Sequence, residues 1–153
     1  METGLIYLGG EIIMNALGYG LISETISDAS HSILNILKGT IFDSTNYPGL
    51  TIFLEKHDIK NTICVIESVI NDIDKEVQKK NSVNLSLEGV LEIIYKIKNE
   101  LNNIEKEISY HNYERYFAGY RTPYYQPYLK NILELYKILK IRIDFLMNIL
   151  KLN

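Results

Sequence analysis

Three histidines and one cysteine are the side chains of this sequence that could bind a metal or attack a substrate. His31, His57 and His111 lie in three separate segments, and Cys64 lies in the apolar run NTICVIESVI. A zinc site needs a denser group of ligands than these histidines provide. A nucleophilic cysteine needs an exposed, electropositive setting, whereas the neighbours of Cys64 are apolar. We therefore expect Cys64 to be a small buried hydrophobe and the histidines to be ordinary surface or seam residues.

The acidic residues do not form a catalytic or metal-binding pattern either. Helical bundles build di-iron sites from Glu-x-x-His pairs and lone glutamates on facing helices, and no Glu-x-x-His occurs here. Glu92, Glu100, Glu105 and Asp144 fall mostly off the apolar helical positions, as expected for a solvated face. No P-loop, dinucleotide fingerprint, G-x-S-x-G or HExxH motif is present. We therefore expect no enzymatic activity, no cofactor and no metal.

A tyrosine-rich stretch, SYHNYERYFAGYRTPYYQPYLKN at 109–131, offers binding chemistry rather than catalysis. It holds seven of the twelve tyrosines, and the chain has no tryptophan. Tyrosine and arginine are enriched in interface hot spots, and two X-Pro bonds stiffen the stretch, which lowers the entropy lost on docking. The plainer alternative is that the rings fill the end of a bundle, and the two roles are compatible. The expected protein-interaction residues are Tyr113, Tyr116, Tyr120, Arg121, Tyr124, Tyr125 and Tyr128.

Apolar residues recur at steps of three and four through most of the chain, which is the spacing of amphipathic helices. One such seam runs through 59–77 and a second through 90–111. A third consists of Leu129, Ile132, Tyr136, Leu139, Ile143, Leu146 and Leu150. We predict helices over 50–80, 86–118 and 127–152, each with charged residues on its opposite face.

Turn and cap residues separate these predicted helices. TNYPGL at 45–50 contains a Pro-Gly turn dipeptide, and the polar residues of 79–89 interrupt the second seam. Residues 119–126 form a Tyr/Pro connector, after which Pro127 suits the first turn of the last helix. The sequence therefore predicts one all-α domain over 1–153. We expect an elongated antiparallel bundle of four to five helices with heptad-like seams of the coiled-coil kind.

The N-terminal segment is apolar on more than one face. The three-four spacing continues through residues 4–38, with Gly39 as a C-terminal stop. We predict two helices or one kinked helix there, because glycines weaken the interior and cap residues favour a break near 23–28. A helix that is apolar all round has to be covered by other protein. We therefore expect contacts to a second copy or another protein at three residues that lie off the seam, Ile6, Ile13 and Leu17.

The same N-terminal segment leaves a membrane-associated role open. A transmembrane helix needs about 20 predominantly apolar residues. Residues 4–22 approach that length, but Glu11 and Asn15 fall near the middle and no lysine or arginine flanks either end. We expect burial in protein rather than in a bilayer. No signal peptide is evident, because Met1-Glu2 stands in place of a basic start.

The charge distribution argues against nucleic-acid binding. The net charge is −3, although residues 110–153 carry seven bases and only three acids. Those bases are spread over the whole C-terminal part rather than clustered, and a basic patch or stripe is the usual footprint of a nucleic-acid interface. The prediction is that the partners are other protein subunits, either a second copy or heterologous proteins, and that nucleic acid is not among them.

These features favour a non-catalytic structural or scaffold protein that acts as a small subunit of a larger assembly. Isoleucine, lysine, asparagine and tyrosine are abundant, a bias typical of AT-rich genomes such as those of many large DNA viruses. The concrete expectation is a minor capsid or other structural component of a virion, located in the virion or inside the cell. The alternatives are a small membrane-associated protein anchored by residues 4–22 and a soluble helical inhibitor or immunity-type binding protein.

Overall fold

The computed structural model describes residues 6–8, 11–13, 21–39, 47–113 and 123–152. Within them the fold is all-α, with six helices and one short two-stranded hairpin. The elements are β1 (Ile6–Leu8), β2 (Glu11–Ile13), α1 (Leu21–Lys38), α2 (Pro48–Lys56), α3 (Ile59–Asn71), α4 (Lys75–Gln78), α5 (Asn81–Tyr113) and α6 (Gln126–Lys151).

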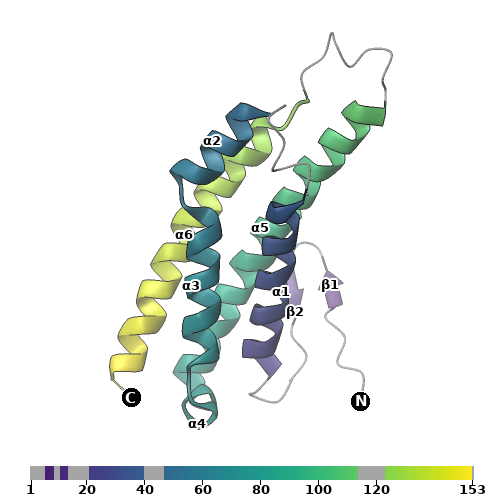
Figure 1. Cartoon of the computed structure of the whole chain (residues 1–153). Helices are drawn as coiled ribbons and strands as arrows, with labels where there is room; N and C mark the ends of the chain where they lie inside the picture. Colours follow the sequence, from purple (N-terminus) through teal and green to yellow (C-terminus); the bar gives the residue numbers. More distant parts are fainter. Residues whose placement is uncertain (1–5, 9–10, 14–20, 40–46, 114–122, 153) are drawn as a thin grey trace.

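The helices form an elongated bundle around one apolar core. Figure 1 shows α1 and α5 running in one direction and α3 and α6 in the other. The long helix α5 packs against both α6 and α1, and α1 also packs against α3. The seam predicted for 90–111 is confirmed at its apolar positions. Its six apolar members are fully buried: Val90, Ile94, Ile97, Leu101, Ile104 and Ile108.

The last predicted helix is confirmed almost to the residue. It was expected over 127–152, and α6 spans Gln126–Lys151 with proline in its first turn. Gly39 also follows the last residue of α1, and its amide donates to the carbonyl of Ile36. The predicted break near 23–28 is wrong, because α1 is one helix from Leu21 onward.

The start of the predicted helix over residues 4–38 is wrong as well, because β1 and β2 occupy part of it. The two strands pair antiparallel, with Ile6 opposite Ile13 and Leu8 opposite Glu11. In the sequence a Gly-Gly dipeptide separates them, and Gly-Gly is favoured in two-residue hairpin connections. Strands of three residues are too short for a periodicity argument to detect.

The predicted helix over 50–80 is three helices, α2, α3 and α4. The break between α2 and α3 falls at Asp58, whose φ of 50° is left-handed. Aspartate is one of the few residues that adopt this conformation without a large penalty. The next break ends at Asp74, whose side chain accepts a hydrogen bond from the amide of Glu76 at 2.7 Å and caps α4.

The helix predicted for 86–118 begins earlier than expected, at Asn81. Val83 and Leu87 are fully buried and extend the seam of α5 by two turns toward its N-terminus. The polar residues between them therefore lie on the outer side of a continuous helix rather than in a loop. Residues beyond Tyr113 at its other end lie outside the described part of the chain.

None of the helices in the described ranges combines the length and the hydropathy that crossing a bilayer requires. Most of residues 4–22, the segment for which a membrane role was left open, lie outside those ranges.

Candidate protein-interaction surface

Helix α6 carries apolar residues on two opposite sides. Its inner side is the predicted seam, of which Leu129, Ile132, Tyr136, Leu139 and Leu146 are buried. Its other side exposes three further large apolar residues, and the C-cap residue of the helix continues their line. We call these four residues the outer stripe: Ile138 (40% exposed), Ile141 (68%), Phe145 (62%) and Leu152 (87%). Their spacing of three, four and seven places them along one line of the helix, as in a heptad repeat.

A groove between α5 and α6 adjoins the outer stripe. It has a volume of about 530 Å³. The α6 side is formed by Ile141, Arg142, Phe145 and Ile149, and the α5 side by Ser82, Leu85, Ser86 and Gly89. Three of the four α5 residues are small, so α5 rises little above the floor of the groove. The fourth, Leu85, adds a further exposed apolar side chain (57%). The groove therefore lies directly beside the outer stripe.

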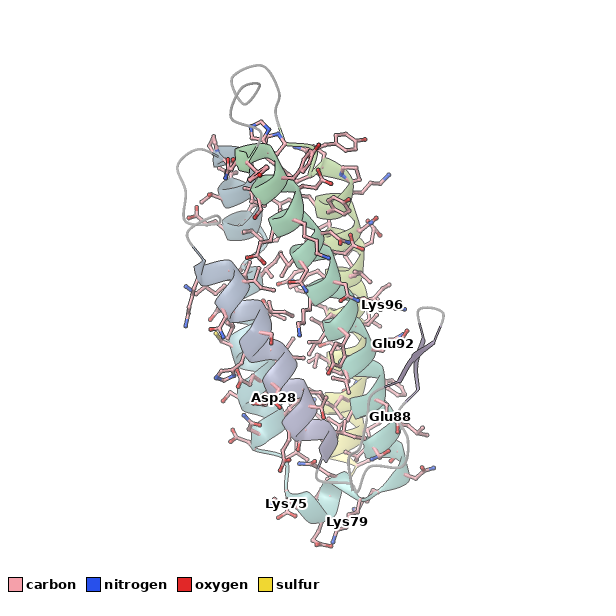
Figure 2. The ribbon with its side chains drawn as sticks, turned by 90° about the vertical axis from the view of Figure 1, so that its right-hand side faces the viewer. Asp28, Lys75, Lys79, Glu88, Glu92 and Lys96 are labelled. Atoms are coloured by element: carbon pink, nitrogen blue, oxygen red, sulfur yellow. The ribbon has the colours of Figure 1, made fainter. Side chains whose placement is uncertain are left out.

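A polar bridge joins the two helices at one end of the groove. The guanidinium of Arg142 donates to the carbonyl of Gly89 and, at 2.8 Å, to the carboxylate of Glu92. Lys96 lies one turn from Glu92 on α5, as Figure 2 shows, and its Nζ is 2.6 Å from the other carboxylate oxygen. Hydrogen bonds from Lys96 and Arg142 lower the pKa of Glu92 from its ordinary value of 4.5. The bridge fixes the position of Arg142.

Charged residues follow the other edge of the outer stripe at intervals of seven. They are Lys130, Lys137, Asp144 and Lys151, all exposed. Seven residues make two helical turns, so these four side chains share one edge of α6, on the side away from α5. Lys137 also pairs with Glu134 at 3.0 Å, an exposed pair that contributes little to stability. Two lysines and one aspartate therefore border the stripe itself, and Lys130 lies about two turns before it.

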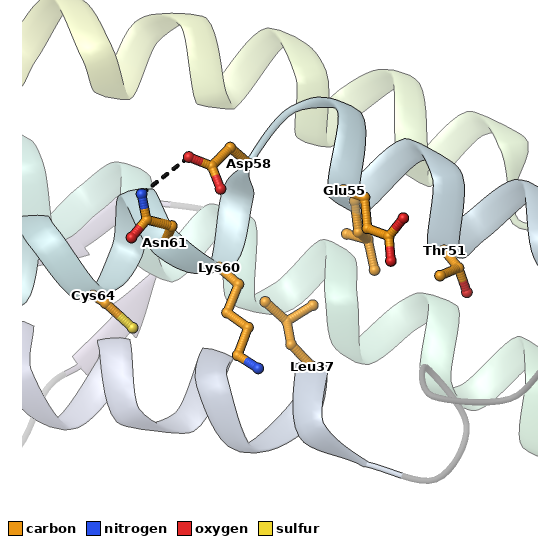
Figure 3. Close-up of a pocket in the computed structure, with 8 residues that line it drawn as sticks. Leu37, Thr51, Glu55, Asp58, Lys60, Asn61 and Cys64 are labelled. Atoms are coloured by element: carbon orange, nitrogen blue, oxygen red, sulfur yellow. Dashed lines mark hydrogen bonds between the residues drawn. The ribbon is translucent and has the colours of Figure 1, made fainter.

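A second hollow, of about 490 Å³, lies between α1, α2 and α3. Cys64 and Lys60 extend from α3 toward α1 in Figure 3, where Leu37 lies, and Asn61 donates to the carboxylate of Asp58 at 3.0 Å. Cys64 is exposed, so the prediction that it is buried is wrong. Its neighbour Ile63 faces the core, and a step of 100° along the helix carries the next residue away from it.

The histidines take ordinary positions in the fold. His31 Nδ1 lies 2.6 Å from Glu67 Oε1, which also accepts a hydrogen bond from Ser27, so these residues link α1 to α3. The ring of His57 lies 4.7 Å from that of Phe53. Among the described residues, no group of three or more histidine, cysteine, aspartate or glutamate side chains is placed to hold a metal ion.

The predicted tyrosine surface is divided between exposed and buried rings. Tyr113 and Tyr124 are 87% and 72% exposed. Tyr125 is buried and meets Tyr47 edge to face, with ring centroids 6.4 Å apart, and burial raises the pKa of its phenol. Tyr128 is half-buried and packs against the core. Part of the set therefore fills the end of the bundle, and part faces outward.

The remaining predicted interaction residues lie outside the described residues or in the hairpin. Tyr116, Tyr120, Arg121 and Leu17 lie outside the described residues. Ile6 and Ile13 are partners in the register of the hairpin.

Sequence reasoning missed the outer stripe, although its signal is present. The residues between 138 and 152 contain two interleaved three-four patterns, and the prediction followed only the one that continues through the whole helix. Comparison with protein-family models, with curated proteins and with solved structures found no match for this chain.

Proposed function

We propose that this protein is a non-catalytic structural or adaptor subunit that binds other proteins through the outer stripe of α6. The observation that carries the proposal is the heptad spacing of Ile138, Ile141, Phe145 and Leu152 on the exposed side of a helix whose other side is already packed. Heptad spacing is the arrangement by which one helix packs against another.

The free energy available at this stripe supports binding. Isolated exposed apolar residues are normal on protein surfaces, but a continuous line beside a hollow is characteristic of an interaction site. Complete burial of a large aliphatic or aromatic side chain stabilises a complex by about 1.5–3 kcal/mol. Ile141 and Phe145 are more than half exposed, so a partner that covers them and Leu85 gains several kcal/mol before the entropy of association is subtracted.

The basis of the proposal differs from the one expected. A docking role was expected from an apolar helix over residues 4–38 and from the tyrosine-rich connector, but β1 and β2 occupy part of the first range. The role now depends on α6. The exposed rings of Tyr113 and Tyr124, at the end of the bundle where α6 begins, provide a second surface of the kind found in interfaces. The AT-rich composition still favours a minor component of a large viral particle as the setting.

Co-purification from the native source with stripe variants tests the proposed function. Ile141→Asp combined with Phe145→Asp places two charges on the outer stripe while leaving the inner seam of α6 unchanged. Val65→Asp is the matched control, because Val65 is an exposed apolar residue (53%) on another helix, α3. Proteins that co-purify in fixed stoichiometry are identified by mass spectrometry for each form, after circular dichroism has shown that all are folded.

The proposed function predicts that the wild type and the Val65→Asp control retain the same partner and that the stripe variant loses it. Retention of every partner by the stripe variant would show that α6 is not the binding surface. A wild-type chain that purifies alone at endogenous levels would remove the case for an assembly subunit.

A further inference from the structure

We infer that the outer stripe and its adjoining groove receive an amphipathic helix of a different protein, with acidic residues along one edge of its apolar face. This inference rests on the proposed function and specifies the partner. It depends on three features of α6 and α5: the length of the stripe, the asymmetry of its two edges and the sign of the charge on the outer edge.

The length of the stripe fits a helix. From Ile138 to Leu152 the stripe covers fourteen steps along α6, a distance of about 21 Å at 1.5 Å per residue. A partner helix of about four turns therefore covers it. The three-four spacing of the stripe residues matches the knobs of a facing helix, whereas an extended strand would present side chains at a period of two.

The two edges of the stripe differ in kind. The edge toward α5 is the groove, where small or apolar residues such as Ser86, Leu85 and Ile149 line the surface and the charge of Arg142 is paired with Glu92. The edge away from α5 carries Lys130, Lys137, Asp144 and Lys151. A helix seated here therefore needs a wide apolar face extending into the groove, and its charged residues belong on the other edge only.

The charges of the outer edge favour acidic partners. Positions that flank a helix–helix seam set the choice of partner through ion pairs across it. Two of the three residues that flank the stripe are lysines. Lys137, whose Nζ also lies 3.0 Å from Glu134, is one turn from Ile141 on α6. Glutamates or aspartates at the facing positions of a partner gain attraction at the lysines, and lysines there are repelled.

The same charge argument makes a second copy of this chain a less favourable partner for the outer stripe. In an antiparallel pair of α6 helices the outer edges face each other. In the register that sets Lys137 opposite Asp144 of the copy, Lys130 faces Lys151, so attraction and repulsion occur equally often. In a parallel pair Lys137 of one copy approaches Arg142 of the other, whose charge is already paired with Glu92, so no attraction is gained. Charge therefore gives self-pairing no advantage.

Two synthetic peptides test this inference. Both contain about three heptads with leucine at the two seam positions and at the flanking position that faces the groove, a length that spans the stripe. At the other flanking position one peptide carries glutamate and the other carries lysine, and like charges keep each peptide from pairing with itself. Binding of each labelled peptide to the whole protein is measured by fluorescence anisotropy at low and at high salt.

We expect the glutamate peptide to bind about tenfold more tightly than the lysine peptide at low salt, with the difference shrinking at high salt. Lys137→Glu should reduce that preference several-fold, whereas Lys60→Glu, which changes the same charge on α3, should leave it unchanged. Phe145→Asp should abolish binding of both peptides. Equal binding of the two peptides, a preference for lysine, or no binding of either would overturn the inference.

The oligomeric state separates this inference from the proposed function. If the wild type forms a dimer in sedimentation experiments and Phe145→Asp makes it monomeric, the stripe is a docking surface but its occupant is a second copy. That result would leave the proposed function standing and refute the acidic helix. If the stripe variant keeps all native partners, both proposals fail together.

Discussion

The two sides of α6 have the same periodicity and opposite surroundings. On the inner side Leu139 has no exposed surface and packs in the core, whereas two residues further along, on the outer side, Ile141 is 68% exposed. Both belong to lines of apolar residues spaced by three and four. The inner line is covered by other helices of the same chain, and nothing in the described part of the chain covers the outer line. Helical spacing therefore identifies a surface suited to packing but does not show what packs against it.

The largest expected difference between the two sides is in stability. Leu139→Ala should lower the free energy of unfolding by about 2–5 kcal/mol, because it removes buried contacts and leaves a cavity. Ile141→Ala removes a side chain of similar size from the exposed side and should change that free energy by less than about 0.5 kcal/mol. Urea unfolding followed by circular dichroism measures both. Equal losses would mean that the outer side is covered within the monomer.

A smaller effect is expected at the polar member of the inner seam. The hydroxyl of Tyr136 forms a hydrogen bond of 2.6 Å with that of Thr62 on α3. Tyr136→Phe should lower the free energy of unfolding by about 1 kcal/mol, because the hydroxyl of Thr62 loses its partner in a partly buried setting. Tyr124→Phe, at a ring that is 72% exposed, provides the control and should have no measurable effect. An unchanged free energy of unfolding in Tyr136→Phe would indicate that a water molecule replaces the lost hydrogen bond.

The bridge beside the groove should respond to acid. The pKa of Glu92 is lowered in the folded state, so its ionised form stabilises the fold above the ordinary value of 4.5, and that contribution is lost as the pH falls below it. Glu92→Gln should therefore be less stable than the wild type at neutral pH, and the difference should shrink on acidification. Because Glu92 is partly exposed, the effect is small. Thermal melts from pH 7 to about pH 3 measure it, and a constant difference across that range would contradict the role of Glu92.

The smallest effect on stability is expected at the centre of the outer stripe. Phe145→Ser should leave the free energy of unfolding within about 0.5 kcal/mol of the wild type, because the ring is largely exposed already. The same substitution should reduce binding of a dye that fluoresces on apolar surfaces. A stability loss comparable to that of Leu139→Ala would place Phe145 in the core and contradict the comparison between the two sides.

The sequence predicts the fold well where a single strong pattern of apolar residues determines the secondary structure. The seam of α5 and the bounds of α6 follow from long runs of isoleucine and leucine at helical spacing and from Pro127 in the first turn. The hairpin at β1 and β2 could not be predicted in this way, because each strand has three residues. The break at Asp58 depends on a single left-handed residue that no periodicity reveals.

The candidate site was harder to predict for a different physical reason. Tyr113 and Tyr125 have the same side chain and lie at the same end of the bundle, yet one is exposed and the other is buried against Tyr47. Composition suggests a surface but does not show which rings reach it. The outer stripe was missed because exposure is a property of packing, and Ile141 looks like any core isoleucine in the sequence.

The bridge from Arg142 to Gly89 and Glu92 gives the groove a direction. It fills the space between α5 and α6 at one end, whereas the other end lies where α5 begins and α6 finishes (Figure 1). A long helix bound in the groove would clash with the bridge if it extended toward Tyr113 and Tyr124, but it could extend past the opposite end of the bundle. The rest of the partner protein would then lie at that opposite end, and the end with the exposed tyrosines would remain accessible to a second partner.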